Sequence, residues 1–354
     1  MTPELLARVP AALRAGAAYH VPQPPQVRAK LDANELPHAL PGELRARLGA
    51  ALAEVALERY PDPTARELRA RVAAQLGVAG DRLTFGNGSD ELIAMIASAF
   101  ATGPVLFPSP SFVYYRLAAT ARGLDAIEVP LRRDFTLDEA ALDAAIARHQ
   151  PGCVFLALPN NPTGTLWRVD LAPELAARYP GVAIVSDEAY VAYSRRTNLP
   201  HAQRNLIVLR TLSKIGLAGL RVGFAISSPE IAALLDKLRP PYNLSALDQR
   251  AAAFAIDEAA SWCDARAAEV VAERARLAAV LAASPLRLEV IPSEANFVLV
   301  RTPRAREIYQ HLFDAGVVVR AFGHSELADC LRITVGSAAE NRLLEHTLAA
   351  VRVS

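Results

Sequence analysis

The middle of the chain, residues 81–226, alternates short β-rich runs with helical segments, and this alternation restricts the possible folds more than any other feature. Several of the runs are continuously apolar, as strands are in a mostly parallel sheet that helices cover on both faces. The candidate strands are residues 83–85, 105–107, 126–129, 154–158, 183–186, 206–209 and 222–226. The pattern predicts a large, doubly wound α/β domain.

The pattern changes after about Pro240. A long alanine-rich helix is predicted over residues 266–282, followed by strands at 286–291, 297–301, 317–320 and 331–335. Strands that are adjacent in sequence and mixed with helices favour a smaller α+β domain. We therefore predict a proline-rich N-terminal arm over residues 1–40, a large domain over 41–240 and a small domain over 241–354. Within the large domain, helices are predicted at 42–58 and 64–76, and the Thr136-Leu-Asp-Glu139 stretch predicts a capping box.

Composition narrows the class of protein. The formal net charge is +1, which gives no electrostatic reason to expect nucleic acid or an anionic membrane as a partner. The N-terminus lacks the basic-then-apolar order of a signal peptide, and no apolar run reaches the roughly 18 residues of a membrane span. Cys153, Cys263 and Cys330 are far apart and odd in number, so neither disulfides nor a metal site are expected. These features predict a soluble, cytoplasmic protein.

Lysine is rare in this chain. Of the 38 lysine and arginine residues only Lys30, Lys214 and Lys237 are lysines, and Lys214 lies in an apolar segment between a strand and a glycine-rich loop. Arginine stays charged, whereas a desolvated lysine can lose its proton and attack a carbonyl to form a Schiff base. Lys214 therefore indicates covalent carbonyl chemistry; the alternative is a loop lysine that survived by chance.

A glycine-rich loop, Phe85-Gly-Asn-Gly-Ser-Asp-Glu91, follows the first candidate strand and opens a helix. Glycines allow close approach of the backbone, and the free N–H groups at a helix start suit a phosphate. Ser89 could add a hydroxyl. The alternative is an ordinary turn between a strand and a helix.

Polar residues also follow the later strands. Asn161 stands in Pro159-Asn-Asn-Pro-Thr-Gly164, which could equally be a tight turn. Asp187 directly follows a buried strand, where a carboxylate must be paired or hydrogen-bonded, and a protonated ring nitrogen would meet that need. Tyr190 lies one helical turn later, and Arg221 lies seven residues beyond Lys214.

Ligands of open α/β sheets lie beyond the carboxyl ends of the strands, and these residues converge there. Phosphate donors, an amide, a carboxylate, a tyrosine, a lysine and an arginine in this order predict a site for pyridoxal phosphate.

The chain resembles the fold-type I pyridoxal phosphate aminotransferases, and in particular the histidinol-phosphate aminotransferases. The similarity covers nearly the whole length. The motifs that carry it are Leu31-Asp-Ala-Asn-Glu35, Arg59-Tyr-Pro61, Gly86-Asn-Gly-Ser-Asp-Glu-Leu-Ile93, Asn161-Pro-Thr-Gly164, Asp187-Glu-Ala-Tyr190, Thr211-Leu-Ser-Lys-Ile-Gly-Leu-Ala-Gly-Leu-Arg221, Ala295-Asn-Phe297 and Leu331-Arg-Ile-Thr-Val-Gly336.

The resemblance implies a role for each matching residue. Lys214 would bind the cofactor covalently and move the substrate proton, and Asp187 would keep the pyridine nitrogen protonated. Asn161 and Tyr190 would bond the ring oxygen. The phosphate would be bound by backbone N–H groups of Ser89 and Asp90, the Ser213 hydroxyl and Arg221.

Two aromatic residues complete the implied cofactor site. Phe112 matches the side chain that stacks on the ring, although many relatives have tyrosine there, so any contribution from a hydroxyl is absent. Tyr60 would reach the phosphate in the neighbouring subunit, which implies a homodimer. The alternative for Tyr60 is aromatic packing at a helix end.

Substrate contacts are implied in the second domain and the arm. Arg332 matches the arginine that binds a substrate α-carboxylate, where a planar fork suits two oxygens. Arg320 matches an arginine for the distal anion; its alternative is a strand-end arginine bonded to solvent or an acid. Tyr19 and Asn34 match arm positions over the substrate, although the arm reads Ala18-Tyr19-His20 in place of the usual Pro-Tyr.

The implied reaction is transamination between L-histidinol phosphate and 2-oxoglutarate in histidine biosynthesis, giving imidazole-acetol phosphate and glutamate. The alternatives within this fold are an aromatic amino-acid aminotransferase and a decarboxylase of the threonine-phosphate type. A pyridoxal phosphate-binding regulator without turnover is disfavoured because the full catalytic set is present.

Overall fold

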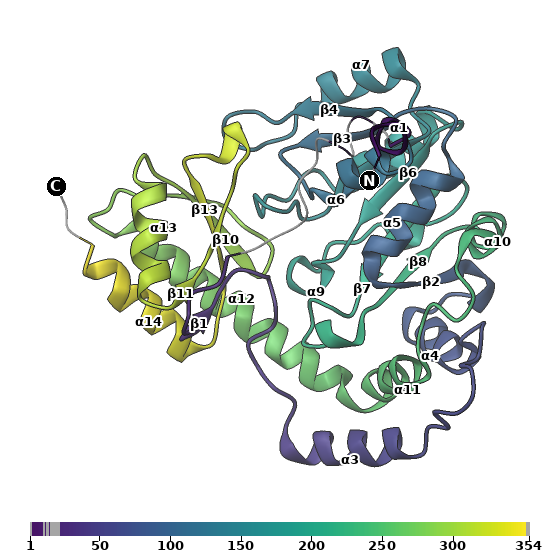
Figure 1. Cartoon of the computed structure of the whole chain (residues 1–354), viewed down its shortest axis with the longest axis horizontal. Coiled ribbons are helices and arrows are strands. Elements are labelled where there is room, and N and C mark those ends of the chain that lie inside the picture. Colours follow the sequence, from purple (N-terminus) through teal and green to yellow (C-terminus); the bar gives the residue numbers. More distant parts are fainter. Residues whose placement is uncertain (1, 10, 12–13, 15–21, 352–354) are drawn as a thin grey trace.

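The structure is a computed structural model that describes residues 2–9, 11, 14 and 22–351. A large sheet with its helices forms one part of the molecule, and a smaller group of strands and helices forms the other (Figure 1). The long helix α12, Ala260–Ala282, runs from one part to the other.

The large sheet has seven strands in the order β2-β8-β7-β6-β5-β3-β4. β8 pairs antiparallel with β2 and β7, and the other pairs are parallel. The strands are β2 Leu83–Asn87, β3 Val105–Ser109, β4 Ala126–Pro130, β5 Cys153–Ala157, β6 Ala183–Asp187, β7 Leu206–Thr211 and β8 Val222–Ile226. All seven predicted strands are present, so the prediction of a doubly wound, mostly parallel domain is confirmed.

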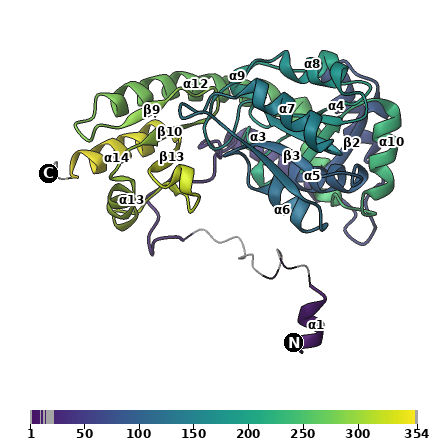
Figure 2. The same ribbon diagram turned by 90° about the horizontal axis from the view of Figure 1, so that it is seen from above.

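Helices cover both faces of this sheet (Figure 2). On one face, α5 (Gly88–Ala99), α6 (Tyr114–Thr120) and α10 (Pro229–Leu238) pack against Phe155, Val185 and Ile207. On the other, α7 (Glu139–His149) and α8 (Leu171–Arg178) pack against Val154, Leu156 and Ile184. Successive strand side chains point to opposite faces, and both faces are buried, which explains why the strands are continuously apolar.

The capping box predicted at Thr136-Leu-Asp-Glu139 is wrong. The N-cap of α7 is Asp138, whose Oδ1 accepts from the backbone N–H of Ala141 at 3.0 Å. Thr136 instead donates its hydroxyl to Asp134 at 2.6 Å. Thr136 and Asp138 both have short polar side chains that can cap a helix. Because Thr136 is bonded to Asp134 in the preceding turn, Asp138 caps the helix instead. A capping box does occur at Ser337 and Glu340, at the start of α14 (Ala338–Ala349).

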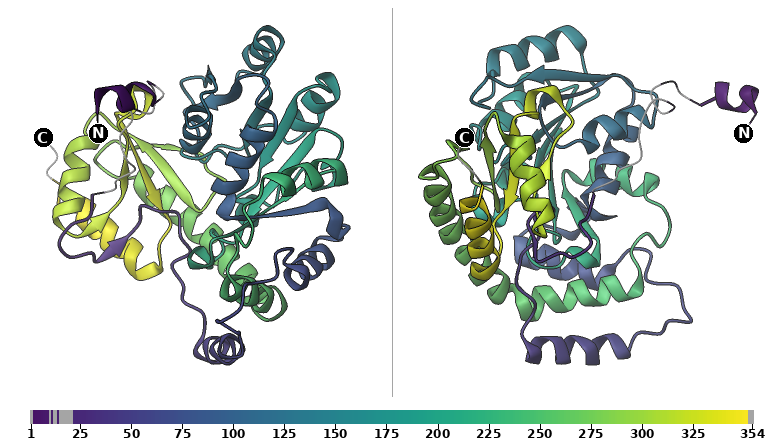
Figure 3. Two further views of the ribbon diagram at one scale, coloured as in Figure 1. Left: turned by 45° about the vertical axis from the view of Figure 1, so that its right-hand side comes forward. Right: turned by 60° about the vertical axis from the view of Figure 1, so that its left-hand side comes forward.

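The smaller part contains a four-stranded antiparallel sheet in the order β12-β13-β10-β9. Its strands are β9 Glu289–Ile291, β10 Phe297–Arg301, β12 Arg320–Ala321 and β13 Cys330–Thr334, packed with α12, α14 and α13 (Ala305–Asp314). The predicted strand at 317–320 is divided, because β11 (Val317–Val318) pairs instead with β1 (Ala29–Lys30) of the arm. The purple arm strand lies beside α14 in the left view of Figure 3.

Helix α11 (Ala246–Phe254) packs against α3 (Gly42–Ala53) and α4 (Arg66–Leu76) of the large part. Ala252, Ala259 and Cys263 share an apolar cluster with Phe224 of the large sheet. The boundary near residue 240 stays a prediction.

Within the described part of the chain, no helix combines the length and the apolar character that a membrane span requires.

Candidate active site

Lys214 lies three residues beyond β7, at the carboxyl end of the large sheet. Its Nζ is 3.4 Å from the backbone oxygen of Ala33 and 5.9 Å from the centre of the Tyr190 ring. Burial, followed by the positive charge of Arg332, lowers the pKa of Lys214 to about 8. A neutral, nucleophilic amine is therefore accessible near physiological pH.

Asp187 is the last residue of β6 and is 5% exposed. Its Oδ2 accepts from the Tyr115 hydroxyl at 2.7 Å, and its Oδ1 accepts from the backbone N–H of Ala189 at 3.1 Å. Burial raises the pKa of Asp187 to about 6, while both hydrogen bonds act to lower it. Sequence reasoning missed Tyr115. A buried carboxylate signals that a donor is needed, but the donor comes from α6, 72 residues earlier.

Tyr190 is buried next to the lysine, and its hydroxyl oxygen accepts from Nδ2 of Asn34 at 2.9 Å. Burial raises the pKa of Tyr190 to about 12, so its hydroxyl keeps its proton. Asn34 comes from the arm and is buried. The structure thus brings the arm into direct contact with the site.

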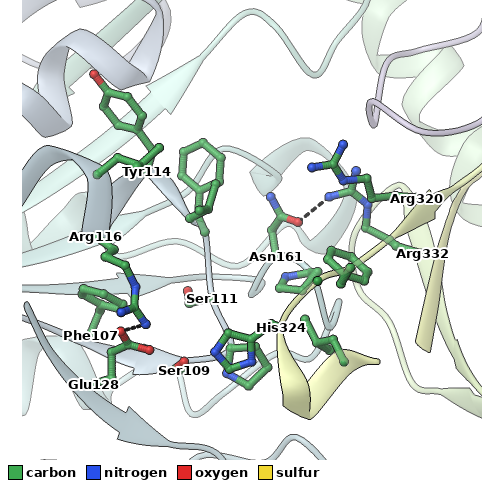
Figure 4. A pocket seen from close by; sticks show the side chains of 18 of the residues that line it. Phe107, Ser109, Ser111, Tyr114, Arg116, Glu128, Asn161, Arg320, His324 and Arg332 are labelled. Atoms are coloured by element: carbon green, nitrogen blue, oxygen red, sulfur yellow. Dashed lines mark hydrogen bonds and ion pairs between the residues drawn. The ribbon is translucent and has the colours of Figure 1, made fainter. Parts of the chain in front are cut away.

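Asn161 follows β5, and its side-chain oxygen accepts from Nη1 of Arg332 at 2.7 Å (Figure 4). Arg332 lies on β13 of the small sheet and also donates to the backbone oxygen of Asp32. Both sheets and the arm therefore meet at Arg332.

A pocket with a volume of about 630 Å³ opens beside this contact. Arg320, Arg332, Asn161 and Phe112 line it, and Arg320 lies close to Arg332 in Figure 4. An ion pair between Arg116 and Glu128 occupies the other side. Two arginines on one wall suit a substrate with anionic groups.

A cradle formed by Gly88, Gly223, Ser213 and Arg221 surrounds the start of α5. Arg221 donates from Nη1 to the Ser213 hydroxyl and from Nη2 to Asp90, both at 3.3 Å. A Cβ on Gly88, whose φ is +76°, would lie 2.5 Å from the Arg221 guanidinium. A Cβ on Gly223 would lie 2.7 Å from the backbone nitrogen of Ser89. Only glycines allow this close approach, and a helix start with an adjacent guanidinium and hydroxyl fits a phosphate.

Two predicted residues lie apart from this group. Tyr60 is 82% exposed and stacks on Tyr242 with 4.6 Å between ring centres. Tyr19 lies outside the described residues. No cluster of three or more metal-ligating side chains occurs within the part of the chain that the structure describes.

Residues 28–351 match the family described as "Aminotransferase class I and II". The chain is 46% identical to histidinol-phosphate aminotransferase 1 of Ralstonia nicotianae, over 93% of this chain and 90% of that protein. It is also 46% identical to the histidinol-phosphate aminotransferase of Chromobacterium violaceum, over 89% of this chain and 90% of that one.

A solved structure of a histidinol-phosphate aminotransferase has the same fold as this chain. Histidinol-phosphate aminotransferase from Sinorhizobium meliloti, in complex with pyridoxal-5'-phosphate, superposes with a TM-score of 0.82 at 25% identity, over 97% of each chain. The chain therefore belongs to the class I and II aminotransferase family and, within it, to the histidinol-phosphate aminotransferases.

Proposed function

We propose that this protein transfers the amino group of L-histidinol phosphate to 2-oxoglutarate, giving imidazole-acetol phosphate and glutamate in histidine biosynthesis. The observation that carries the proposal is the 46% identity to a histidinol-phosphate aminotransferase across 93% of the chain. The pocket supports it, since Arg320 and Arg332 share one wall and both substrates carry anions.

The cofactor is pyridoxal phosphate, and the residues of the site fit it. The glycine cradle at Gly88 and Arg221 suits the phosphate, and the buried Asp187 suits the ring nitrogen. When bound, the cofactor supplies an aldehyde and an electron-withdrawing ring that makes the substrate Cα–H acidic.

Lys214 would hold the cofactor and then move the substrate proton. Since its pKa is lowered to about 8, the amine can accept a proton from the substrate Cα and would then donate it to C4′ of the cofactor. Its position between Ala33 and the Tyr190 ring limits the directions in which the amine can move.

Asp187 would hold the ring nitrogen in its protonated form through a charge-assisted hydrogen bond. Asn161 and Tyr190 would bond the ring oxygen, and both already stand in fixed hydrogen bonds, to Arg332 and to Asn34. Phe112 would stack on the ring.

The phosphate would be bound by the backbone N–H groups of Ser89 and Asp90, the Ser213 hydroxyl and the Arg221 guanidinium. Arg221 already contacts Asp90 and Ser213, so the three side chains are grouped at the start of α5. Backbone N–H groups of the first helical turn would supply further donors.

Arg332 would bind the α-carboxylate of glutamate, and Arg320 would bind the distal carboxylate or the phosphate of histidinol phosphate. The two residues are paired across β12 and β13, where Arg320 is the register partner of Arg332. Neighbouring strands therefore set the spacing of the two anion sites.

The active unit in this proposal is a homodimer. The exposed Tyr60 is the residue that would enter the partner's site and contact its phosphate. A cytoplasmic location is also proposed, supported by the three buried free cysteines Cys153, Cys263 and Cys330, which suit a reducing compartment.

The decisive experiment compares kcat/KM for histidinol phosphate and phenylalanine as amino donors to 2-oxoglutarate. We expect a preference for histidinol phosphate of at least about 10²-fold, since a site built for a buried anion discriminates strongly against a donor without one. Arg320→Met should remove most of that preference. A preference of the wild-type enzyme for phenylalanine would overturn the substrate assignment and leave fold and family intact.

A further inference from the structure

Tyr115 is fully buried in the core of the large part, yet it carries a polar group. Its ring stacks on Phe155 with 4.7 Å between centres and an angle of 12°, and Phe112 meets its ring edge-on at 5.6 Å. These two ring contacts restrict the orientation of the Tyr115 side chain. The hydroxyl is therefore aimed by packing, and it donates to Asp187 at 2.7 Å.

The Asp187 carboxylate receives a donor on each oxygen. Tyr115 donates to Oδ2 and the Ala189 N–H to Oδ1, so rotation of the carboxylate about its χ2 angle would break at least one bond. Each carboxylate oxygen has two lone pairs, so one remains on each for another donor. The carboxylate is thus oriented before any ligand arrives.

We propose that Tyr115 is a positioning residue for the transamination: its hydroxyl fixes the orientation of the Asp187 carboxylate and keeps it ionised, so that Asp187 can bind the protonated ring nitrogen of pyridoxal phosphate. The inference rests on the proposed role of Asp187 and extends it to a residue outside the cofactor's direct contacts.

The charges around Asp187 make such a donor necessary. Burial and the negative charges of Asp90 and Glu188 all raise the pKa of Asp187, and the Tyr115 and Ala189 hydrogen bonds oppose them. Tyr190 also interacts electrostatically with Asp187, and it is neutral because burial raises its pKa to about 12. The pKa of Tyr115 is raised well above its usual value by burial and by Asp187, so Tyr115 remains a neutral donor.

A donor to the carboxylate favours the ionised form, so its loss raises the pKa of Asp187. In Tyr115→Phe the ionised form would disappear at higher pH than in the wild type. The acidic limb of kcat, and of the absorbance titration of the bound cofactor, should move up by about one pH unit.

The test uses the holoenzyme of wild type, Tyr115→Phe and a matched control, Tyr179→Phe. Tyr179 also donates its hydroxyl to an aspartate at 2.8 Å, but this aspartate, Asp143, lies on α7 and not at the cofactor site. We expect Tyr115→Phe to shift the absorbance titration, to raise the Kd for pyridoxal phosphate by about 5–10-fold and to lower kcat. Tyr179→Phe should leave the titration, the Kd and kcat unchanged.

A fluorinated tyrosine at position 115 gives a second variant that keeps both the ring and the hydroxyl. Its phenol is a stronger donor, so the acidic limb should move to lower pH, opposite to the Tyr115→Phe shift. Coincident titrations of wild type and Tyr115→Phe, or a fluorotyrosine shift in the same direction as Tyr115→Phe, would overturn the proposal.

Asp187→Asn separates this inference from the role of Asp187 itself. If Asp187→Asn binds the cofactor and turns over like the wild type, the proposed role of Asp187 fails. If Asp187→Asn is inactive while Tyr115→Phe behaves like the wild type, only the role of Tyr115 fails.

Discussion

Asn34 donates from Nδ2 to the hydroxyl oxygen of Tyr190 at 2.9 Å, which ties the N-terminal arm to the active site. The orientation of the Asn34 amide is set by Thr334, whose hydroxyl donates to Oδ1 at 3.1 Å. The backbone of Asn34 is held as well, since its oxygen accepts from Asn296 at 2.9 Å. Because Tyr190 accepts from Asn34, the phenolic proton of Tyr190 is left to donate elsewhere.

Asn34→Asp should therefore reverse the direction of this hydrogen bond. A carboxylate accepts from Tyr190 and would withdraw the proton that is proposed to bond the ring oxygen of the cofactor. We expect kcat/KM to fall by about 10–10²-fold, since charged hydrogen bonds of this kind contribute about 1.5–3 kcal/mol. Asn34→Gly, which tolerates the φ of 55° at this position, should cause a smaller loss. Equal kinetics for wild type and Asn34→Asp would contradict the proposed orientation.

The sequence predicted the strands of the large sheet because both faces of that sheet are buried. Residues such as Val154 and Phe155 point to opposite faces yet are both apolar, which leaves a continuous run to detect. The polar residues after these runs, Asn161, Asp187 and Lys214, were predicted to lie together, since parallel strands bring their carboxyl ends to one edge.

Long-range pairing was not predictable in the same way. The arm strand β1 has only two residues, which is too short to show a period. Its residue Ala29 pairs with Val317, which lies 288 residues later in the sequence. Tyr115 likewise has no local signal, because an aromatic residue at an apolar helix position is indistinguishable from a core residue. Its polar role depends on Asp187, which only the folded chain brings within 2.7 Å.

The capture of pyridoxal phosphate by the cofactor-free protein should follow the protonation of Lys214. Burial lowers the pKa of Lys214 from 10.5 to about 8, and only the neutral amine attacks an aldehyde. The capture rate should therefore rise with pH and reach half its maximum near pH 8. Stopped-flow absorbance measurements from about pH 6 to about pH 11 would give the capture rate on both sides of this pKa.

Variants test the assignment of this titration. Lys214→Ala should eliminate covalent capture, whereas Lys237→Ala, in the exposed part of α10, should retain it. Arg332→Met removes a positive charge that lowers the pKa of Lys214, so its midpoint should move to higher pH. A wild-type midpoint near 10.5 would show that the lysine is not desolvated.

Gly88→Ala should weaken cofactor binding through Arg221. The new Cβ would lie 2.5 Å from Nη2 of Arg221, and the φ of +76° is strained for alanine. Since the guanidinium can move away more easily than the backbone can, we expect both a raised Kd for pyridoxal phosphate, by about 10-fold, and a stability loss of about 1–2 kcal/mol. Equilibrium dialysis and chemical denaturation measure the two effects.

Gly49→Ala is the matched control for that substitution. Gly49 lies within α3, and a Cβ there meets nothing within 4 Å. Alanine is the better helix former, so this variant should be more stable than the wild type by about 0.5–1 kcal/mol, with an unchanged Kd for the cofactor. A similar rise in Kd for both glycine variants would show that the effect does not come from Arg221.

The buried ion pair between Glu188 and Arg210 should be essential for stability. Nη2 of Arg210 is 3.0 Å from Oε2 of Glu188, whose side chain is 0% exposed, and Glu188 also accepts from the Asn198 N–H and the Thr197 hydroxyl. Arg210→Ala leaves a carboxylate buried without its cation and should lower the free energy of unfolding by about 3–5 kcal/mol.

Glu188→Gln combined with Arg210→Ala provides the comparison that isolates this charge. The amide oxygen of glutamine can still accept from Asn198, but it carries no charge, so the double variant should recover part of the stability lost in Arg210→Ala. Arg168→Ala, which removes an exposed partner of Glu174, should change the free energy of unfolding little. Because Glu188 follows Asp187 and Arg210 precedes Lys214 by four residues, Arg210→Ala should also lower kcat at temperatures where it remains folded. Denaturation midpoints that are equal for Arg210→Ala and Arg168→Ala would contradict the importance of the buried pair.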